Sequence, residues 1–214
     1  MRLTLIRHAI SKHILDGIIS GVKSCPGLSE DGYTQARLLA DRFRRTGDHN
    51  SSQVLLTSPV LRARQTADII AQAFPLGSPA IDPGLVELIP GDADGLTQSQ
   101  YRERYGDFHP ENDPGRLFAP NGESWSGFME RVTLTLDRLA AQYASQDVVA
   151  VTHAGFIVAS FIVLFQLSHF DSQTGSRSRA TINPLNTSLT VWQEEQGAWQ
   201  LLRYNDTSHL LNSG

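Results

Sequence analysis

The sequence predicts an α/β protein of three layers, α/β/α, with a mainly parallel central sheet and antiparallel edge strands. Short apolar, β-prone runs alternate with stretches of helical periodicity, which is typical of helices packed on a parallel sheet. The last two runs flank a Glu-Glu-Gln-Gly segment, which indicates a hairpin and thus antiparallel strands at the edge. A chain of 214 residues also fits one domain. We therefore expect a single domain over 1–214, with a small insertion at about residues 88–122.

Five segments have the composition of strands. Residues 2–6 and 53–57 are short, apolar runs that end where polar residues begin. Residues 147–152 are more continuously apolar, which favours a strand buried on both faces. Residues 187–193 and 198–204 form the expected hairpin.

Helical periodicity appears in the intervening stretches. Residues 30–45 follow Ser29, a plausible N-cap, and a second helix runs to about residue 74. We expect Ser58 to cap this second helix and Pro59 to occupy its first turn. A short helix is expected at 97–105 and a core helix at 154–167, whereas 75–95 and 106–122 are rich in loop-forming residues. A further helix presents one apolar face, made of Trp125, Phe128, Met129, Val132, Leu136, Leu139 and Tyr143.

Composition argues against several classes of protein. The net charge of −4 gives no basic surface, which argues against a nucleic-acid partner. The longest apolar stretch, 154–167, is shorter than the roughly 18 residues of a membrane span, and the N-terminal apolar run is too short for a signal peptide. The single cysteine, Cys25, allows neither an intrachain disulfide nor a cysteine-based zinc site. We therefore expect a cytoplasmic protein without a membrane or nucleic-acid partner.

Reactive side chains follow three of the predicted strands. Arg7 and His8 end the first strand, Arg62 lies in the helical turn after the second, and His153 follows the strand at 147–152. Ligands of such folds bind beyond the carboxyl ends of the strands, so these side chains could share one rim. Taken singly, each is more often a structural or surface residue. An arginine near a helix N-terminus opposes the helix dipole, however, and a bound anion would offset it.

Two arginines and two histidines on one rim would form a strongly positive pocket. A phosphate monoester is close to a dianion at neutral pH, because its second pKa is about 6. A planar guanidinium can bind two of its oxygens at once, and phosphoryl transfer depends mainly on positioning and charge stabilisation. These residue types therefore favour phosphate chemistry.

Six motifs follow one another along the chain. They are Leu5–His8, Leu28–Ala36, Ser58–Ala67, Leu85–Glu87 with Gly91 and Gly95–Thr97, Gly122–Ser124, and Val151–Gly155. Together, and in this order, they resemble the motifs of the histidine phosphatase superfamily, the phosphoglycerate mutase-like proteins. The resemblance covers nearly the whole chain.

The resemblance implies a role for each candidate residue. His8 would attack phosphorus and become a phosphohistidine, while Arg7, Arg62 and His153 would hold the phosphoryl oxygens. Glu87 would protonate the leaving oxygen and then help to activate water. His8 must attack as neutral imidazole, so we expect a backbone carbonyl to fix its tautomer.

Other positions are matched less closely. Ser11 falls where relatives contact substrate. Ala9 replaces a usual glycine, and its methyl group is expected to reshape the pocket wall. Ile14 replaces a frequent asparagine, so a polar phosphate contact is expected to be missing there. No metal or other cofactor is implied.

The leading hypothesis is a phosphatase that hydrolyses a small phosphorylated metabolite. One alternative is a phosphoglycerate-type mutase, but the resemblance implies a longer insert with extra basic residues for mutases, and residues 88–122 contain only Arg102, Arg104 and Arg116. The other is a non-catalytic phosphate sensor, which Ala9 and Ile14 motivate. Specificity is assigned to the loops at 12–27, 88–122 and 170–183, and the sequence does not fix the oligomeric state.

Overall fold

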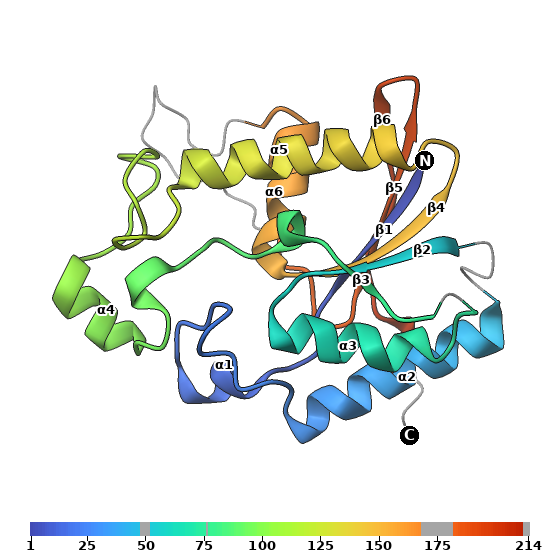
Figure 1. Cartoon of the computed structure of the whole chain (residues 1–214), viewed down its shortest axis with the longest axis horizontal. Coiled ribbons are helices and arrows are strands. Elements are labelled where there is room, and N and C mark those ends of the chain that lie inside the picture. The colour runs from blue at the N-terminus through green and yellow to red at the C-terminus, as the bar shows by residue number, and fades with distance from the viewer. Residues whose placement is uncertain (48–51, 76, 168–181, 212–214) are drawn as a thin grey trace.

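The computed structural model describes residues 1–47, 52–75, 77–167 and 182–211. Its core is one six-stranded sheet in the order β3-β2-β4-β1-β5-β6 (Figure 1). The strands are β1 (Arg2–Arg7), β2 (Ser52–Thr57), β3 (Ala80–Ile81), β4 (Asp147–Thr152), β5 (Leu189–Glu195) and β6 (Ala198–Asp206). The first four strands of the order are parallel, and β5 and β6 are antiparallel at one side. The predicted fold class, including the antiparallel edge, is confirmed.

Helices cover both faces of the sheet. They are α1 (Lys12–Asp16), α2 (Glu30–Thr46), α3 (Leu61–Ala71), α4 (Gln98–Tyr105), α5 (Trp125–Gln142) and α6 (Ala154–Leu164), with short 3₁₀ turns η1 (Pro83–Leu85), η2 (Gly91–Ala93) and η3 (Ser208–Leu210). In Figure 1, α5 and α6 lie on one side of the sheet and α2 and α3 on the other. The residues 88–122 include η2 and α4, which stand beside the sheet rather than on it.

The alternation of side chains along β4 explains the layers. Val148 and Ala150 pack with α5 and α6, whereas Val149 and Val151 pack with α2 and α3. The predicted apolar face of α5 enters the first of these cores: Phe128 and Leu136 are buried, and Trp125 packs against them. The sheet is therefore apolar on both faces, which leaves the strand ends as the place for reactive polar side chains.

The helix after β2 begins later than predicted. Val60 is its N-cap and α3 starts at Leu61. The Ser58 hydroxyl oxygen accepts from the Val60 amide at 3.4 Å and from His153 Nε2 at 2.8 Å, ahead of the helix. Arg62 still lies in the first turn. The helices α3 and α6 end at Ala71 and Leu164, before the predicted 74 and 167.

The elements α1 and β3 were not predicted, and both are short. No helix in the described ranges is long and apolar enough to cross a membrane.

Candidate active site

Three neighbouring parallel strands bring the candidate residues to one rim. The amide of His8, after β1, donates to the Thr152 carbonyl at the end of β4 at 2.9 Å. The amide of Ser58, after β2, donates to the Val151 carbonyl of the same strand at 3.0 Å. His153 follows Thr152 directly, so main-chain hydrogen bonds set His8, Ser58 and His153 side by side.

Arg62 joins the two histidines. Its Nε lies 3.0 Å from His8 Nε2, and its Nη2 lies 3.2 Å from His153 Nδ1. The two imidazole centroids are 5.1 Å apart. Arg62 Nη1 donates to the carbonyl of Ser20 at 3.0 Å, so the loop after α1 is bound to the same guanidinium. The rings of residues 8 and 153 therefore face one compartment.

The hydrogen bonds assign the tautomer of each ring. A carbonyl can only accept, so His8 Nδ1, 2.8 Å from the Ala9 carbonyl, carries the hydrogen. A guanidinium can only donate, so His8 Nε2 presents its lone pair to Arg62. For the same reason His153 Nδ1 accepts from Arg62, and its Nε2 donates to Ser58 Oγ at 2.8 Å. As expected, a backbone carbonyl fixes the tautomer of His8.

The surroundings keep these imidazoles neutral. Burial lowers the pKa of His8 and of His153 well below the ordinary histidine value, and the charge of Arg62 lowers both further. Burial, followed by the charges of Arg62 and Arg7, also lowers the pKa of His13 to about 4. A neutral ring keeps a lone pair, so His8 is available as a nucleophile at neutral pH.

Arg7 supplies a second guanidinium. Its Nη1 donates to the Pro184 carbonyl at 2.7 Å, whereas its buried Nε has no hydrogen-bond partner among the described residues. The segment that follows Pro184 also contacts the backbone of the nucleophile, because Asn186 Nδ2 donates to the carbonyl of His8 at 2.8 Å. Burial lowers the pKa of Arg7. A buried donor without a partner suits an anionic ligand.

Glu87 reaches the cavity beside His8 and Arg62 from the loop after η1. Its Oε2 accepts from the Gly155 amide at 2.9 Å, and its Oε1 accepts from the Leu88 amide at 3.2 Å. A Cβ atom at Gly155 would lie 2.1 Å from Oε1, so only glycine allows the carboxylate this close to the start of α6.

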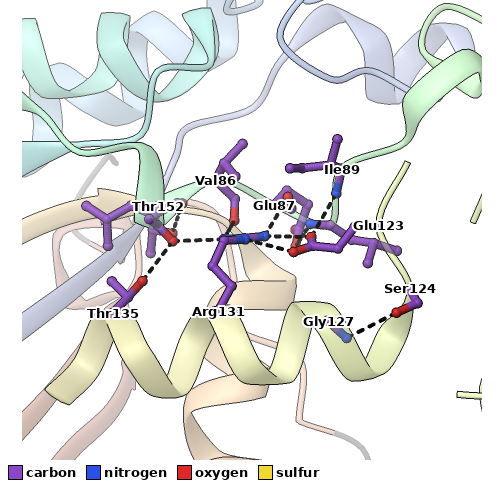
Figure 2. A network of polar contacts seen from close by, with 12 residues as sticks. Val86, Glu87, Ile89, Glu123, Ser124, Gly127, Arg131, Thr135 and Thr152 are labelled. Atoms are coloured by element: carbon purple, nitrogen blue, oxygen red, sulfur yellow. Dashed lines mark hydrogen bonds and ion pairs between the residues drawn. The ribbon is translucent and has the colours of Figure 1, made fainter. Parts of the chain in front are cut away.

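Arg131, on α5, holds the loop that carries Glu87 (Figure 2). Its guanidinium donates to the carbonyls of Gly84, Val86 and Glu87. It also pairs with Glu123 at 2.8 Å, and Glu123 accepts from the amide of Ile89 (Figure 2). Sequence reasoning missed Arg131, although Glu123 lies in one of the six motifs.

The remaining predicted positions lie elsewhere. Ser11 is buried, donates to the Gly27 carbonyl at 2.7 Å and contacts His13 Nδ1 at 2.9 Å, so it positions His13 rather than lining the cavity. The methyl group of Ala9 packs with Leu28 and Ala36 in a small core cluster, so the expectation that it reshapes the pocket wall was wrong. Ile14 does line the cavity.

The cavity has a volume of about 420 Å³ and is lined by Arg7, His8, His13, Ile14, Arg62 and Glu87, among others. A larger hollow of about 670 Å³ lies between η1 and α5, but none of its lining residues is a histidine. We therefore place the chemistry in the smaller cavity. In the described part of the chain no group of three or more histidine, cysteine, aspartate or glutamate side chains could hold a metal ion. Most of the expected specificity loop at 170–183 lies outside the described residues.

Comparisons with known proteins found relatives and similar structures over nearly the whole chain. The chain is 29% identical over 98% of its length to a bifunctional protein of Mycobacterium tuberculosis, and it spans about half of that relative, 55%. It is 26% identical to a metal-independent phosphoserine phosphatase of Arabidopsis thaliana, with 99% of this chain and 84% of that protein covered. The structure of an α-ribazole phosphatase from Shigella flexneri superposes with a TM-score of 0.78 at 24% identity, covering 97% of each chain.

The decisive match is to a family rather than to one relative. The sequence pattern of the histidine phosphatase superfamily (branch 1) matches residues 3–207, which include every side chain placed above in the cavity. The chain belongs to the histidine phosphatase superfamily.

Proposed function

We propose that this protein is a phosphatase that hydrolyses a small phosphorylated metabolite through a phosphohistidine on His8. One observation carries the proposal: the lone pair of a neutral, buried His8 Nε2 points at the Arg62 guanidinium within hydrogen-bond distance, at the wall of a cavity that Arg7 and Glu87 also line. A nucleophile, two cations and an acid are the groups that transfer of a phosphoryl group to histidine requires.

In the first step Arg62 Nε would turn its hydrogen bond from His8 Nε2 to a phosphoryl oxygen, and the lone pair of His8 Nε2 would then form a bond to phosphorus while the ester P–O bond breaks. The hydrogen stays on Nδ1 and is donated to the Ala9 carbonyl, which stabilises the positive charge that the ring gains. Arg7 and Arg62 would bind the phosphoryl oxygens. His153, whose Nε2 donates to Ser58 and whose Nδ1 accepts from Arg62, would hold the Arg62 guanidinium in place. Glu87, in its protonated form, would donate its proton to the leaving oxygen.

In the second step water would attack phosphorus and the P–N bond would break. Glu87, now ionised, accepts the proton of the water, and the lone pair returns to His8 Nε2 as inorganic phosphate leaves. The proposal gains support from relatives whose names are those of phosphatases, among them a phosphoserine phosphatase and an α-ribazole phosphatase. Because the first relatives are nearly twice as long as this chain, a further activity elsewhere in a longer protein would be compatible with this one.

The mutase alternative finds less support. Arg102 pairs with Asp107 at 3.2 Å, and Arg116 donates to the carbonyls of Asp107 and Tyr105. Neither guanidinium lines the cavity, and nor does Arg104. A site with few closing cations admits water, which favours hydrolysis of the phosphohistidine over its return to a substrate.

The sensor alternative rested on Ala9 and Ile14. Since the Ala9 methyl group packs in the core, it leaves the nucleophile unobstructed.

The free thiol of Cys25 is compatible with the reducing cytoplasm that the sequence favours.

The test is turnover of p-nitrophenyl phosphate with and without EDTA. We expect turnover that EDTA leaves unchanged, together with acid-labile, base-stable phosphate labelling that His8→Ala abolishes. Absence of turnover by the wild-type protein at mildly acidic to neutral pH would favour a sensor. Conversion of 3-phosphoglycerate to 2-phosphoglycerate, in place of phosphate release, would favour a mutase.

A further inference from the structure

The cavity has two unlike ends. Arg7, His8, Arg62 and Glu87 gather at the strand ends, whereas the rest of the wall is largely apolar. The large apolar side chains of that wall are Ile14, Ile18, Ile19, Leu88, Phe118, Trp125 and Phe128. An apolar wall takes up the carbon skeleton of a ligand and leaves a charged group without partners.

The wall is held from behind by packed side chains. Phe118 stacks on Tyr101 with ring centroids 4.4 Å apart and an interplanar angle of 16°. Trp125 packs edge-on against Phe128, which is fully buried in the main core. Aromatic rings fixed in this way form a preformed surface, so a ligand pays little ordering cost on meeting it.

The cations of the wall are confined to the phosphate end. Among the residues that the structure describes, Arg7 and Arg62 are the arginines that line this cavity, and no lysine does. Lys23 lines a neighbouring hollow of about 150 Å³ instead. Glu123 and three backbone carbonyls engage the guanidinium of Arg131. A carboxylate carried by the substrate in addition to its phosphate would therefore meet no positive partner among the described residues of this wall.

Three polar side chains complete the wall, namely Gln98, His13 and Ser20, and all three are neutral. Gln98 is an uncharged amide, exposed at the start of α4. His13 is held by Ser11, and burial together with the two arginines keeps its ring unprotonated near neutral pH. These groups can hydrogen-bond a hydroxyl or ether oxygen without requiring a charge.

We propose that the preferred substrate is a phosphate monoester of an uncharged alcohol or phenol with an apolar or aromatic skeleton. This inference rests on the proposed phosphatase function. Ile14 is then a specificity-determining residue, because it puts an alkyl side chain on the wall beside His13.

The test compares phenyl phosphate with 4-carboxyphenyl phosphate, whose leaving groups have similar acidity but differ by one negative charge. We expect kcat/KM, measured by phosphate release, to be about tenfold or more higher for phenyl phosphate, the scale on which pockets discriminate such groups. O-phosphoserine is expected to be a poorer substrate than either.

A variant pair sharpens the comparison. Ile14 is 44% exposed, so Ile14→Arg should fold normally and would place a cation on the wall. We expect it to raise the ratio of kcat/KM for the carboxylated ester to that for phenyl phosphate by about tenfold. The matched control is Leu134→Arg, at an exposed apolar position on α5 (62% exposed) outside the cavity, which should leave the ratio unchanged.

The outcomes separate the two proposals. Equal or faster turnover of the carboxylated ester by the wild-type protein, or an unchanged ratio in Ile14→Arg, would overturn the substrate class while phosphatase activity stands. Release of phosphate from neither ester would instead remove the proposed function itself.

Discussion

Nε of Arg62 donates to Nε2 of His8 across 3.0 Å, so the arginine engages the very lone pair that would attack phosphorus. The guanidinium of Arg62 also bonds to His153 and to the Ser20 carbonyl, which fixes it at the centre of the site. A phosphoryl group bound there would have to meet this guanidinium and His8 together. Arg62 therefore orients the nucleophile as well as supplying charge.

Arg62→Lys tests this double role. Lysine keeps the charge but lacks the planar fork that joins both imidazoles, so we expect kcat/KM to fall by about 10²-fold, as when one transition-state donor is lost. The measurement is p-nitrophenyl phosphate turnover, with thermal unfolding as a check on folding. Arg64→Lys, an exposed arginine on the same helix, is the control and should stay near wild type. Equal effects in the two variants would contradict the role.

Glu87→Gln tests the assignment of the acid. The amide keeps the shape of the side chain but cannot transfer a proton, so esters with poor leaving groups should suffer most. We expect kcat to fall by about 10²- to 10³-fold for an alkyl phosphate and by less than about tenfold for p-nitrophenyl phosphate. Equal slowing of the two esters would place the acid elsewhere.

Gly155→Ala tests the close approach of α6 to Glu87. The added methyl carbon would stand 2.1 Å from Oε1, so the carboxylate has to move away from its amide donor. We expect the leaving-group dependence of Glu87→Gln in weaker form, with a native fold by circular dichroism. Gly115→Ala is the control, because its methyl carbon would meet Asp113 at an ordinary 3.5 Å. A variant with wild-type turnover of alkyl phosphates would show that the contact is dispensable.

Acidification should destabilise the fold through its buried histidines. The pKa values of His8 and His153 are lowered by burial, and that of His13 is lowered to about 4. In the unfolded chain these histidines titrate near pH 6.5. Between about pH 6.5 and 4 the unfolded chain therefore binds protons at positions where the folded chain does not. The free energy of unfolding should therefore fall as the pH drops through this window.

Urea titrations at pH 7, 6 and 5 would measure this loss of stability. His13→Asn should flatten the pH dependence, because it removes one of the groups that titrates late in the folded state. The exposed His109 provides the control substitution, His109→Asn. An identical pH slope in wild type and His13→Asn would contradict this explanation.

The arrangement of the rim could be predicted because parallel strands end at a common edge. Arg7, His8 and His153 each follow a strand whose apolar run is plain in the sequence, and β1 and β4 are direct neighbours. Arg62 was found for the same reason, since the helix it belongs to starts just after β2. The family motifs then supplied Glu87, which strand patterns alone leave on an ordinary loop.

What was missed depends on contacts between residues far apart in sequence. Ser58 has the local sequence of an N-cap, but the helix starts at Leu61, and the Ser58 hydroxyl also accepts from His153, 95 residues away. Arg131 lies on an amphipathic helix, where an arginine is usually a surface residue, and only the folded chain shows its three carbonyl partners. The strand β3 has two residues, too few for any periodicity.

The amide-to-carbonyl hydrogen bonds at the ends of β1, β2 and β4 fix the position of the nucleophile. They do so independently of the apolar side chains that line the cavity wall. Substitutions along α1 or in residues 88–122 can therefore alter which molecule is accepted without disturbing the atoms that would break the ester. Proteins descended from one ancestral enzyme could change their substrate specificity in this way while keeping the same reaction.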